Sequence, residues 1–312
     1  MNGRKESCPE ELLSRFQRDN SEGGVLAICV NWNGKGVVGT TLASLLESDY
    51  DHLQVVVVDN ASIDGSTEEI PEEAVIYRLD QNLGYGGAIN RAVQPLLEVG
   101  RQDTIAPNFF LLLNNDLVVE KGAVRRLVEQ ARKAGPGVYG PKVLSFSDPS
   151  RLDAAWGRVT WSHVLTRFCG KSASALEERW NKTRRVELLM GCCLLVHRKV
   201  FETVGLFDER FFMYHEEVDF LYRAARAGFP IWYCPQAEVS HRGAFSTRSQ
   251  PLQKVRWLRE NTIRFFRKYR PGPLHWAYFW ATLTASLLFN LVTLRWSRMN
   301  AIYRGVRRGF EG

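Results

Sequence analysis

A cluster of amide and carboxylate side chains directly follows a strongly apolar segment near the middle of the chain. Residues 109–113 are all apolar, and Asn114, Asn115 and Asp116 come next. An apolar run of this kind is typical of a buried strand, and parallel sheets bind ligands at the carboxyl ends of their strands. A carboxylate at that place, here Asp116, can hold a divalent cation that carries a diphosphate. Asn and Asp also end strands in simple turns, so this segment alone leaves both interpretations open.

Two other predicted strands end in similar polar residues. They cover residues 25–30 and 55–58, and both are apolar runs closed by turn residues. A helix expected over residues 36–46 joins them into a strand–helix–strand unit, so Asp59 is predicted to face the same crevice as Asp116. An acid at the end of a second strand commonly accepts hydrogen bonds from a nucleotide. The polar residues at these two strand ends are Asn31, Trp32, Asn33, Asp59, Asn60 and Ser62.

A glycine-rich segment follows a third predicted strand at residues 75–78 and opens a helix that is expected to reach about residue 99. Free backbone N–H groups at such a helix start are able to face an anion. A dinucleotide-binding loop is the alternative, but the glycines match G-x-G-x-x-G poorly and do not follow the first strand. The candidate binding residues of this segment are Asn82, Gly84, Tyr85 and Asn90.

Three acids follow an aromatic run in a predicted helix further along the chain. Glu216, Asp219 and Arg223 have the spacing of one helix face, and Glu217 points about a quarter-turn away. Apolar surroundings disfavour the ionised form of an acid, which poises it to act as a general base. A solvated helix start also favours acids, but it does not explain the aromatic residues 211–214 beside them.

The composition is that of an ordinary globular chain. Of 312 residues, 45% are hydrophobic and 24% are charged, which suits one α/β domain with an appendage. None of the six cysteines forms a C-x-x-C pair, so a zinc ribbon or redox motif is not expected. This use of cysteine suits a protein of the reducing cytosol. Residues 1–20 are polar and charged, without the apolar core of a signal peptide.

The positive charge is concentrated near the carboxyl end. Residues 254–312 contain twelve basic and two acidic side chains, which gives this part a net charge of +10. Because the whole chain has a net charge of +7, the remaining residues have a net charge of −3. Within this part, residues 274–294 carry no formal charge over 21 positions, near the length that spans a bilayer. Polar residues lower the hydrophobicity of this segment, so we expect a helix that lies in an anionic membrane surface, with a buried helix as the alternative. A nucleic-acid partner is not expected.

Taken in order along the chain, these motifs resemble the inverting family-two glycosyltransferases of the type-A fold, especially their bacterial rhamnosyltransferase-like branch. The resemblance covers roughly residues 24–248. It divides the chain into a polar segment (1–23), a catalytic domain (24–248) and a basic helical tail (249–312). The motifs that carry it are residues 31–34, 58–62, 82–85, 114–116, 190–191 and 212–219, and His241.

The resemblance implies an α/β, Rossmann-like fold and a role for each motif. Asp116 matches the last acid of the family's D-x-D motif and binds Mg²⁺ or Mn²⁺, with His241 completing the metal site. Glu217 matches the catalytic base, and Glu216 and Asp219 are its acidic neighbours. The first D-x-D acid is Asn114 here, and a Glu replaces the usual Asp base, so Glu216 remains an alternative base. The expected donor-binding residues are Asn31, Trp32, Asn33, Asp59, Asn60, Ser62, Asn82, Gly84, Tyr85, Asn90, Asn114 and Asn115.

The expected function is metal-dependent, inverting transfer of a sugar from a nucleotide-diphosphate donor to a glycan or polyprenyl-linked acceptor. The branch favours dTDP-rhamnose and cell-envelope polysaccharide synthesis, at the cytoplasmic face of the cell membrane. Two alternatives remain at this point: transfer of another hexose (mannose, galactose or N-acetylglucosamine), or a catalytically impaired sugar-nucleotide-binding protein, which Asn114 favours.

Overall fold

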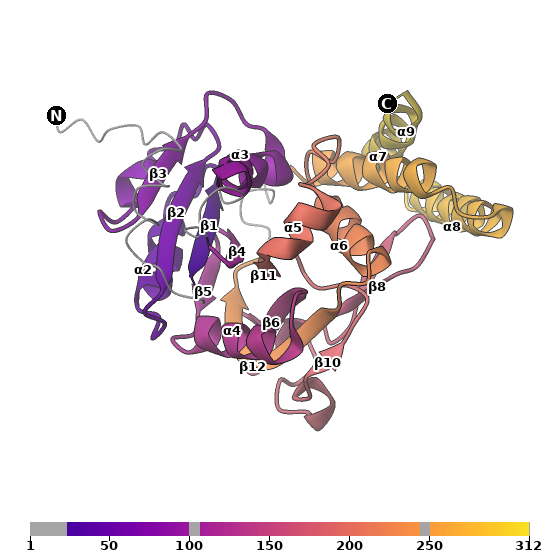
Figure 1. Ribbon diagram of the computed structural model, residues 1–312. Helices are drawn as coiled ribbons and strands as arrows, with labels where there is room; N and C mark the ends of the chain where they lie inside the picture. Colours follow the sequence, from indigo (N-terminus) through magenta and orange to yellow (C-terminus); the bar gives the residue numbers. More distant parts are fainter. Residues whose placement is uncertain (1–23, 100–106, 244–249, 312) are drawn as a thin grey trace.

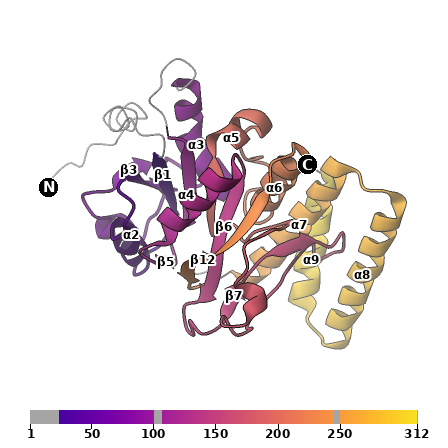
Figure 2. The same ribbon diagram turned by 60° about the horizontal axis from the view of Figure 1, so that its bottom comes forward.

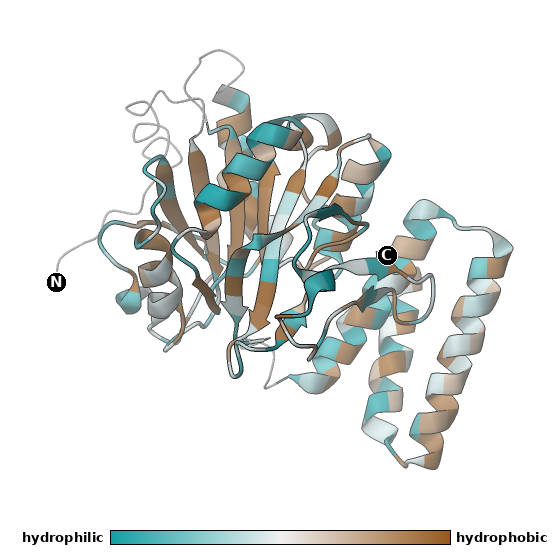
Figure 3. Ribbon diagram, turned by 90° about the horizontal axis from the view of Figure 1, so that it is seen from below, coloured by the Kyte–Doolittle hydropathy of each residue, from teal (hydrophilic) through white to brown (hydrophobic). Residues whose placement is uncertain are grey.

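The side chains of the first strand point alternately into two buried layers, which sets a three-layer architecture. In the computed structural model, which describes residues 24–99, 107–243 and 250–311, strand β1 (Val25–Asn31) is buried on both faces. Leu26 and Ile28 pack in a cluster with α3, α5 and α6, whereas Val25 and Ala27 pack in a second cluster with α2 and α4. The sheet therefore lies between two helical layers (Figure 1), and its strands are largely hydrophobic along their length (Figure 3). The expected segment 1–23 lies outside the described residues.

The central sheet is mixed. Its strand order is β10-β12-β6-β11-β4-β1-β2-β3, with β5 paired to β12 and β7 paired to β6. β1 is parallel to its neighbours β2 and β4, while β11 is antiparallel and lies between β4 and β6. The strands are β1, β2 (Leu53–Asp59), β3 (Val75–Arg78), β4 (Phe109–Asn114), β5 (Leu117–Val119), β6 (Val138–Ser145), β7 (Leu152–Ala154), β8 (Gly157–Val159), β9 (Thr166–Phe168), β10 (Arg184–Arg185), β11 (Cys193–His197) and β12 (Ile231–His241).

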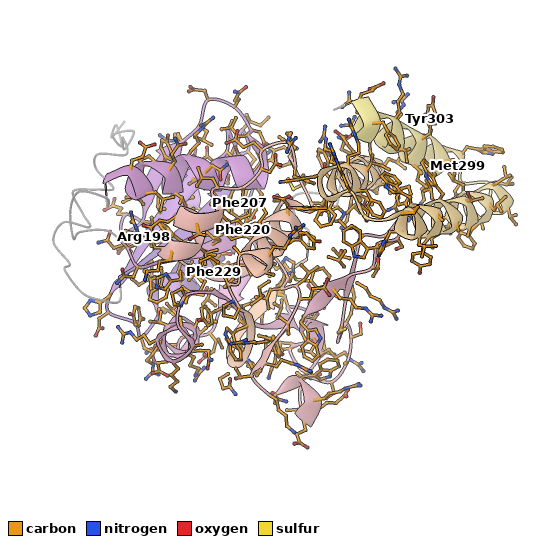
Figure 4. All side chains as sticks on the ribbon, turned by 45° about the vertical axis from the view of Figure 1, so that its right-hand side comes forward. Arg198, Phe207, Phe220, Phe229, Met299 and Tyr303 are labelled. Carbon is orange, nitrogen blue, oxygen red and sulfur yellow. The ribbon has the colours of Figure 1, made fainter. Side chains whose placement is uncertain are left out.

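The helices cover both faces of the sheet and extend beyond it at the carboxyl end. Stacking of Phe207 on Phe220, with ring centroids 4.7 Å apart, fixes the loop before α6 against the helix itself (Figure 4). The helices are α2 (Val38–Leu46), η1 (Ser66–Glu69), α3 (Gly84–Val99), α4 (Ala123–Ala134), η2 (Glu178–Trp180), α5 (Arg198–Val204), α6 (Glu216–Arg226), α7 (Pro251–Tyr269), α8 (Pro273–Val292) and α9 (Trp296–Glu311).

The strand ends converge as the sequence predicted, and the sheet register explains why. Asn31 is the register partner of Asp59, and Val30 is the partner of Asn114. Three strands therefore end at one level on the same edge of the sheet. At the other side of this edge, β12 pairs with β5 so that His241 lies opposite Leu117, next to Asp116.

Helix α7 belongs to the same body as the sheet, although the expected division placed it in a separate tail. Ile263, Phe265 and Phe266 of α7 are fully buried in the core cluster that also contains β1 and α6 residues. Helix α9 packs along α7, and its Gly305 lies so close that a Cβ atom there would come within 2.4 Å of the Arg256 carbonyl oxygen. Helix α7 thus packs into the core and α9 packs on α7, and the expected division of the chain at residue 249 stays a prediction.

Helix α8 contains the predicted uncharged segment, and it has two apolar faces. Phe279 and Leu283 are buried on the inner face, where Phe279 contacts Phe266 of α7. Helix α8 lies at the outer edge of the molecule (Figure 2), and exposed apolar residues on the face opposite Phe279 form a stripe with helical spacing along its length. Among the described residues, no helix combines the length and the apolar character that crossing a membrane requires. The stripe consists of Leu274, Tyr278, Ala281, Ala285, Leu288 and Val292.

We predict that Gly305→Val lowers the melting temperature by several degrees, because the added side chain forces α9 away from the α7 backbone. Overpacking of this kind costs about 1–3 kcal/mol. Scanning calorimetry measures the effect, and Arg304→Ala, a change at the neighbouring exposed position, is the control. Equal melting temperatures for Gly305→Val and the wild type would show that α9 does not pack on α7 through this glycine.

Candidate functional site

A cavity of about 520 Å³ lies at the converging strand ends and opens between the sheet edge, α6 and α7. Six of the expected donor-binding residues line it, together with the expected metal and base residues. Side chains from β7, β9, the following loop and α7 complete its wall. The polar and charged residues among its lining are Asn60, Asn82, Asn114, Asn115, Asp116, Asp153, Thr166, Lys171, Tyr85, Trp32, His215, Glu216, Glu217, His241 and Lys254.

Asn31 lies beneath this cavity instead of lining it. Its side chain is fully buried, and its amide nitrogen donates to Asp59 (3.0 Å) and to Ser66 (2.9 Å), while its carbonyl oxygen accepts from Asn115 (2.8 Å). Asp59 in turn accepts from the backbone N–H of Ser62. In this structure these residues join three strand ends and orient Asn115, and their direct contact with a donor stays a prediction.

The side chain of Asn33 is also engaged in the loop, where its oxygen accepts from the backbone N–H of Ile63. Trp32, between Asn31 and Asn33, does line the cavity. The loop after β1 thus presents one of its three predicted donor-binding side chains to the cavity and uses the other two to hold itself together.

The glycine-rich start of α3 permits the close approach of another loop. The carbonyl oxygen of Phe212 lies 2.0 Å from the place where a Cβ atom of Gly84 would be, and Gly84 has a φ of +75°. Its N–H is capped by Asn82, which also accepts a hydrogen bond from Asn60. Gly84 therefore allows the loop that precedes the acidic helix to close over α3, while Asn60 and Asn82 face the cavity.

Asn90, predicted to bind the donor, holds the loop before α6 in this structure. It is buried in α3, where its amide donates to the Phe207 carbonyl and its oxygen accepts from the Phe207 N–H, both at 2.9 Å. This two-point bond fixes the same loop from its other end. Asn90 does not line the cavity, because it follows the cavity-facing Tyr85 by more than one turn of α3.

Asp116 and His241 meet at one point of the cavity wall. The Nε2 atom of His241 lies 3.4 Å from Oδ1 of Asp116, and its Nδ1 atom lies 2.8 Å from Oδ2 of Asp153 on β7. Burial acts to lower the pKa of His241, but the two carboxylates outweigh it and raise the pKa to about 9. The sequence predicted the pair of Asp116 and His241. Asp153, which orients the imidazole, was missed.

The backbone just before α6 adopts an unusual conformation. Tyr214 and His215 both have positive φ, 68° and 69°, a region that residues other than glycine occupy only when their surroundings hold them there. The amide of Asn261 on α7 donates to the Met213 and Tyr214 carbonyls, at 2.9 and 2.7 Å. Helix α7 therefore fixes the turn that aims the first residues of α6 into the cavity.

Glu216 and Glu217 begin α6 and both face the cavity. Burial raises the pKa of Glu216 well above its ordinary value, and the charge of Glu217 raises it further. Burial also raises the pKa of Glu217, but hydrogen bonds from the backbone N–H groups of Glu217, Val218 and His215 favour its ionised form. Glu217 is the more exposed of the two, while Glu216 is 5% exposed. When one proton is shared, Glu216 is thus the acid that holds it.

Asp219 contacts Arg223 of its expected helix face but does not line the cavity with Glu216 and Glu217. It is fully buried, pairs with Arg223 (2.9 Å) and Lys268 (2.6 Å), and accepts a hydrogen bond from the Tyr269 hydroxyl. These contacts attach α6 to the end of α7, and the catalytic role considered for Asp219 stays a prediction.

Two cations of the cavity wall were not found from the sequence. Lys254 lies on α7, with its ammonium 5.1 Å from the centre of the Tyr214 ring, and Lys171 lies in the loop after β9. Burial lowers the pKa of Lys254, and the charge of Lys171 lowers it further. Lys254 had been counted in the basic tail, and no local pattern marks either lysine as part of the site.

Comparisons with known proteins identify the family. The model of the glycosyl transferase family 2 matches residues 27–205. The N-acetylglucosaminyl-diphospho-decaprenol L-rhamnosyltransferase of Mycobacterium tuberculosis is 31% identical over 275 residues, which cover 82% of this chain and 90% of the relative. The low-salt glycan biosynthesis hexosyltransferase of Haloferax volcanii is 26% identical over 219 residues, 70% of this chain and 65% of the relative.

Solved structures show the same fold at low sequence identity. GalNAc-T7, crystallised with UDP, GalNAc and Mn²⁺, has a TM-score of 0.54 at 15% identity, over 78% of this chain and 50% of that chain. Staphylococcus aureus TarS has a TM-score of 0.50 at 13% identity, over 79% of this chain and 42% of that chain. With the family model matching more than half of its residues and a relative 31% identical over most of both lengths, the chain belongs to glycosyl transferase family 2 and is a rhamnosyltransferase-like glycosyltransferase of the type-A fold.

Proposed function

We propose that this enzyme transfers a sugar, with inversion at the anomeric carbon, from a nucleotide-diphosphate donor to a hydroxyl group of a lipid-linked glycan. The observation that carries the proposal is one cavity in which a buried acid pair, Glu216 and Glu217, faces a carboxylate–imidazole pair, Asp116 and His241. The first pair suits proton removal from an acceptor, and the second suits a metal that accompanies a diphosphate.

Asp116 and His241 fit a site for a divalent cation whose other ligands come from the diphosphate of the donor substrate. The described residues contain no group of three or more His, Cys, Asp or Glu side chains that could hold a metal ion by themselves. Asp116 and His241 supply two donor atoms, and Asp153 fixes the imidazole through Nδ1, as outer carboxylates do for metal-bound histidines. Mg²⁺ or Mn²⁺ held there neutralises the charge that develops on the leaving diphosphate. The imidazole favours Mn²⁺.

Glu217 is the base in this proposal, and its neighbour sets its protonation. Backbone N–H groups stabilise the ionised form of Glu217, while Glu216 is more deeply buried and holds a proton. The acceptor hydroxyl transfers its proton to Glu217 as it attacks the anomeric carbon from the face opposite the diphosphate. One displacement inverts that carbon, and no covalent sugar–enzyme bond is required.

The relatives favour a particular donor and acceptor class. The Mycobacterium relative is named for L-rhamnose transfer to N-acetylglucosaminyl-diphospho-decaprenol, which favours dTDP-rhamnose and a polyprenyl-diphosphate-linked acceptor in cell-envelope glycan synthesis. Both substrates then carry phosphate groups. Lys171 and Lys254, which share the cavity with Asp116, provide the positive charge that such substrates require.

The exposed stripe of α8 supports association with a membrane at its cytoplasmic face. Leu274 and Val292, at the two ends of the stripe, are 82% and 81% exposed, and the stripe is continuous between them. Arg295 and Arg298 follow its end. An apolar helix face next to arginines is typical of helices that lie in the surface of an anionic bilayer. A lipid-linked acceptor would be reached from such a position.

The direct test is a panel of nucleotide sugars with a short-chain N-acetylglucosaminyl-diphospho-lipid acceptor. We expect Mn²⁺-dependent release of nucleoside diphosphate with dTDP-rhamnose, and a product of inverted anomeric configuration by NMR. Asp116→Ala is the control and should lose metal-dependent donor binding. Thermal stabilisation by a donor without any turnover would instead support the catalytically impaired binding protein, and turnover with another hexose would correct the sugar.

We predict that Glu217→Gln keeps donor binding and reduces turnover by at least about a hundredfold, the usual contribution of a general base. The amide preserves the shape and cannot accept the acceptor proton. Initial rates with saturating donor measure this, and Glu216→Gln, expected to be milder, is the matched comparison. A larger loss in Glu216→Gln than in Glu217→Gln would assign the base to Glu216.

We predict that Asp219→Asn destabilises the fold, because it leaves Arg223 and Lys268 without their buried partner. Breaking a buried pair from one side costs about 3–5 kcal/mol. Urea unfolding measures the loss, and Glu178→Gln, which removes an exposed pair with Lys182, is the control with little expected effect. An unchanged urea midpoint combined with abolished turnover would return Asp219 to the catalytic residues.

We predict that Leu288→Gln with Val292→Gln weakens flotation with anionic vesicles by at least about tenfold, because both side chains are apolar and exposed. Leu176→Gln, at an 87% exposed leucine remote from α8, is the control. Point changes are preferable to removal of α8 and α9, since α9 covers α7. If the wild type does not float with any vesicle, the stripe does not bind membranes and something else covers it. Analytical ultracentrifugation of the protein then shows whether a second copy of the chain does so.

A further inference from the structure

A second cavity, of about 480 Å³, lies where α7 ends and α8 begins, apart from the catalytic cavity. It is formed by the loop before α6, the last two turns of α7 and the first turn of α8. Positive and aromatic side chains alternate around it. Its lining consists of Arg210, Phe211, Arg264, Phe266, Arg267, Lys268, Arg270, Pro271 and Trp276.

The walls of this cavity carry more positive charge than their ion pairs compensate. Five cationic side chains line it, and the carboxylates that pair with them are Asp208, Asp219 and Glu260, so two positive charges remain in excess. Among the residues that the structure describes, Arg267 donates only to the Gly309 and Phe310 carbonyls, and Arg270 forms no ion pair. A cavity of this composition attracts an anion with several acceptor oxygens, such as a phosphate.

Its position relative to the stripe of α8 indicates where that phosphate comes from. Trp276 faces the cavity from the inner side of α8, whereas Leu274 and Tyr278 begin the exposed stripe on the outer side. A helix is about 10 Å thick, and an interfacial helix sinks roughly 5–10 Å into the boundary between headgroups and acyl chains. When the stripe is at that depth, the inner side of α8 lies at the level of the headgroups.

We propose that this cavity binds the phosphate of a phospholipid headgroup in the bilayer on which α8 lies. The proposal deepens the proposed membrane association and adds a specific site to it. Arg270 and Arg267 contact the phosphate oxygens, Arg210 closes the opposite wall, and Trp276 occupies the interface between polar and apolar regions. Lys268, one of the residues that line this cavity, pairs with Asp219 of α6.

Flotation with two kinds of vesicle of equal surface potential tests the proposal. In one the anionic lipid is phosphatidic acid, and in the other it is cholesteryl hemisuccinate, a carboxylate. We expect the full-length wild type to prefer phosphatidic acid, and the double variant Arg210→Gln with Arg270→Gln to lose that preference at an unchanged melting temperature. Arg304→Gln, which removes an exposed charge from α9, should weaken binding to both vesicles by about fivefold and keep the preference.

Several outcomes would overturn the proposal. Equal flotation of the wild type with both vesicles shows that charge alone attracts the enzyme. A preference that survives in the double variant places the phosphate elsewhere. Thermal stabilisation by inorganic phosphate that depends on Arg270, without a preference for phosphatidic acid, assigns the cavity to free phosphate.

Transfer to a water-soluble acceptor is measured in parallel. Its absence in the wild type contradicts the proposed transferase function, whatever the vesicles show. Loss of flotation in the Leu288→Gln with Val292→Gln variant, together with an intact preference in the Arg210→Gln with Arg270→Gln variant, leaves membrane association standing and removes the headgroup site.

Discussion

One amide group, that of Asn261, holds the backbone on which the position of the first residues of α6 depends. It donates to two successive carbonyls, of Met213 and Tyr214, in a turn whose next residue, His215, also has positive φ. Such a conformation costs about 1–3 kcal/mol for each residue and persists only where neighbouring groups fix it. From the other side, Gly84 leaves room for the Phe212 carbonyl. The aim of Glu216 and Glu217 into the cavity follows from these two restraints.

Because Asn261 belongs to α7, the position of Glu216 and Glu217 depends on the carboxyl-terminal helices. Helix α7 is fixed by Asp219 at its end and by α9 along its side, where Gly305 permits close approach. The outer helices and the turn before the acid pair therefore contact the same helix, α7. This arrangement explains why the basic segment, which the sequence presented as an appendage, contributes Lys254 to the cavity.

The parts of the site that were predictable are those that one strand or one helix start encodes locally. The apolar run before Asp116, and the polar ends of the strands at Asn31 and Asp59, identify the edge of the sheet, since strand ends with a common register must converge. Which side chains then face a ligand depends on packing between distant segments. Asn31 and Asp59 are turned into a buried network, and Asp153 meets His241 across 88 positions of the chain. The hydrophobic periodicity of a sequence does not predict contacts between residues so far apart in the chain.

The charge of the catalytic cavity gives a physical reason for Asn114, the most conspicuous departure from the family pattern. Asp116, Asp153 and Glu217 already bring negative charge to a cavity that, in the proposed reaction, also receives a diphosphate. Another carboxylate at position 114 would add repulsion at a site of limited solvent access. An amide instead offers both a donor and an acceptor. Lys171 and Lys254, which line the same cavity, offset part of this negative charge. A neutral residue at position 114 is therefore compatible with catalysis, because the cavity depends on the balance of its charges and not on a count of its acids.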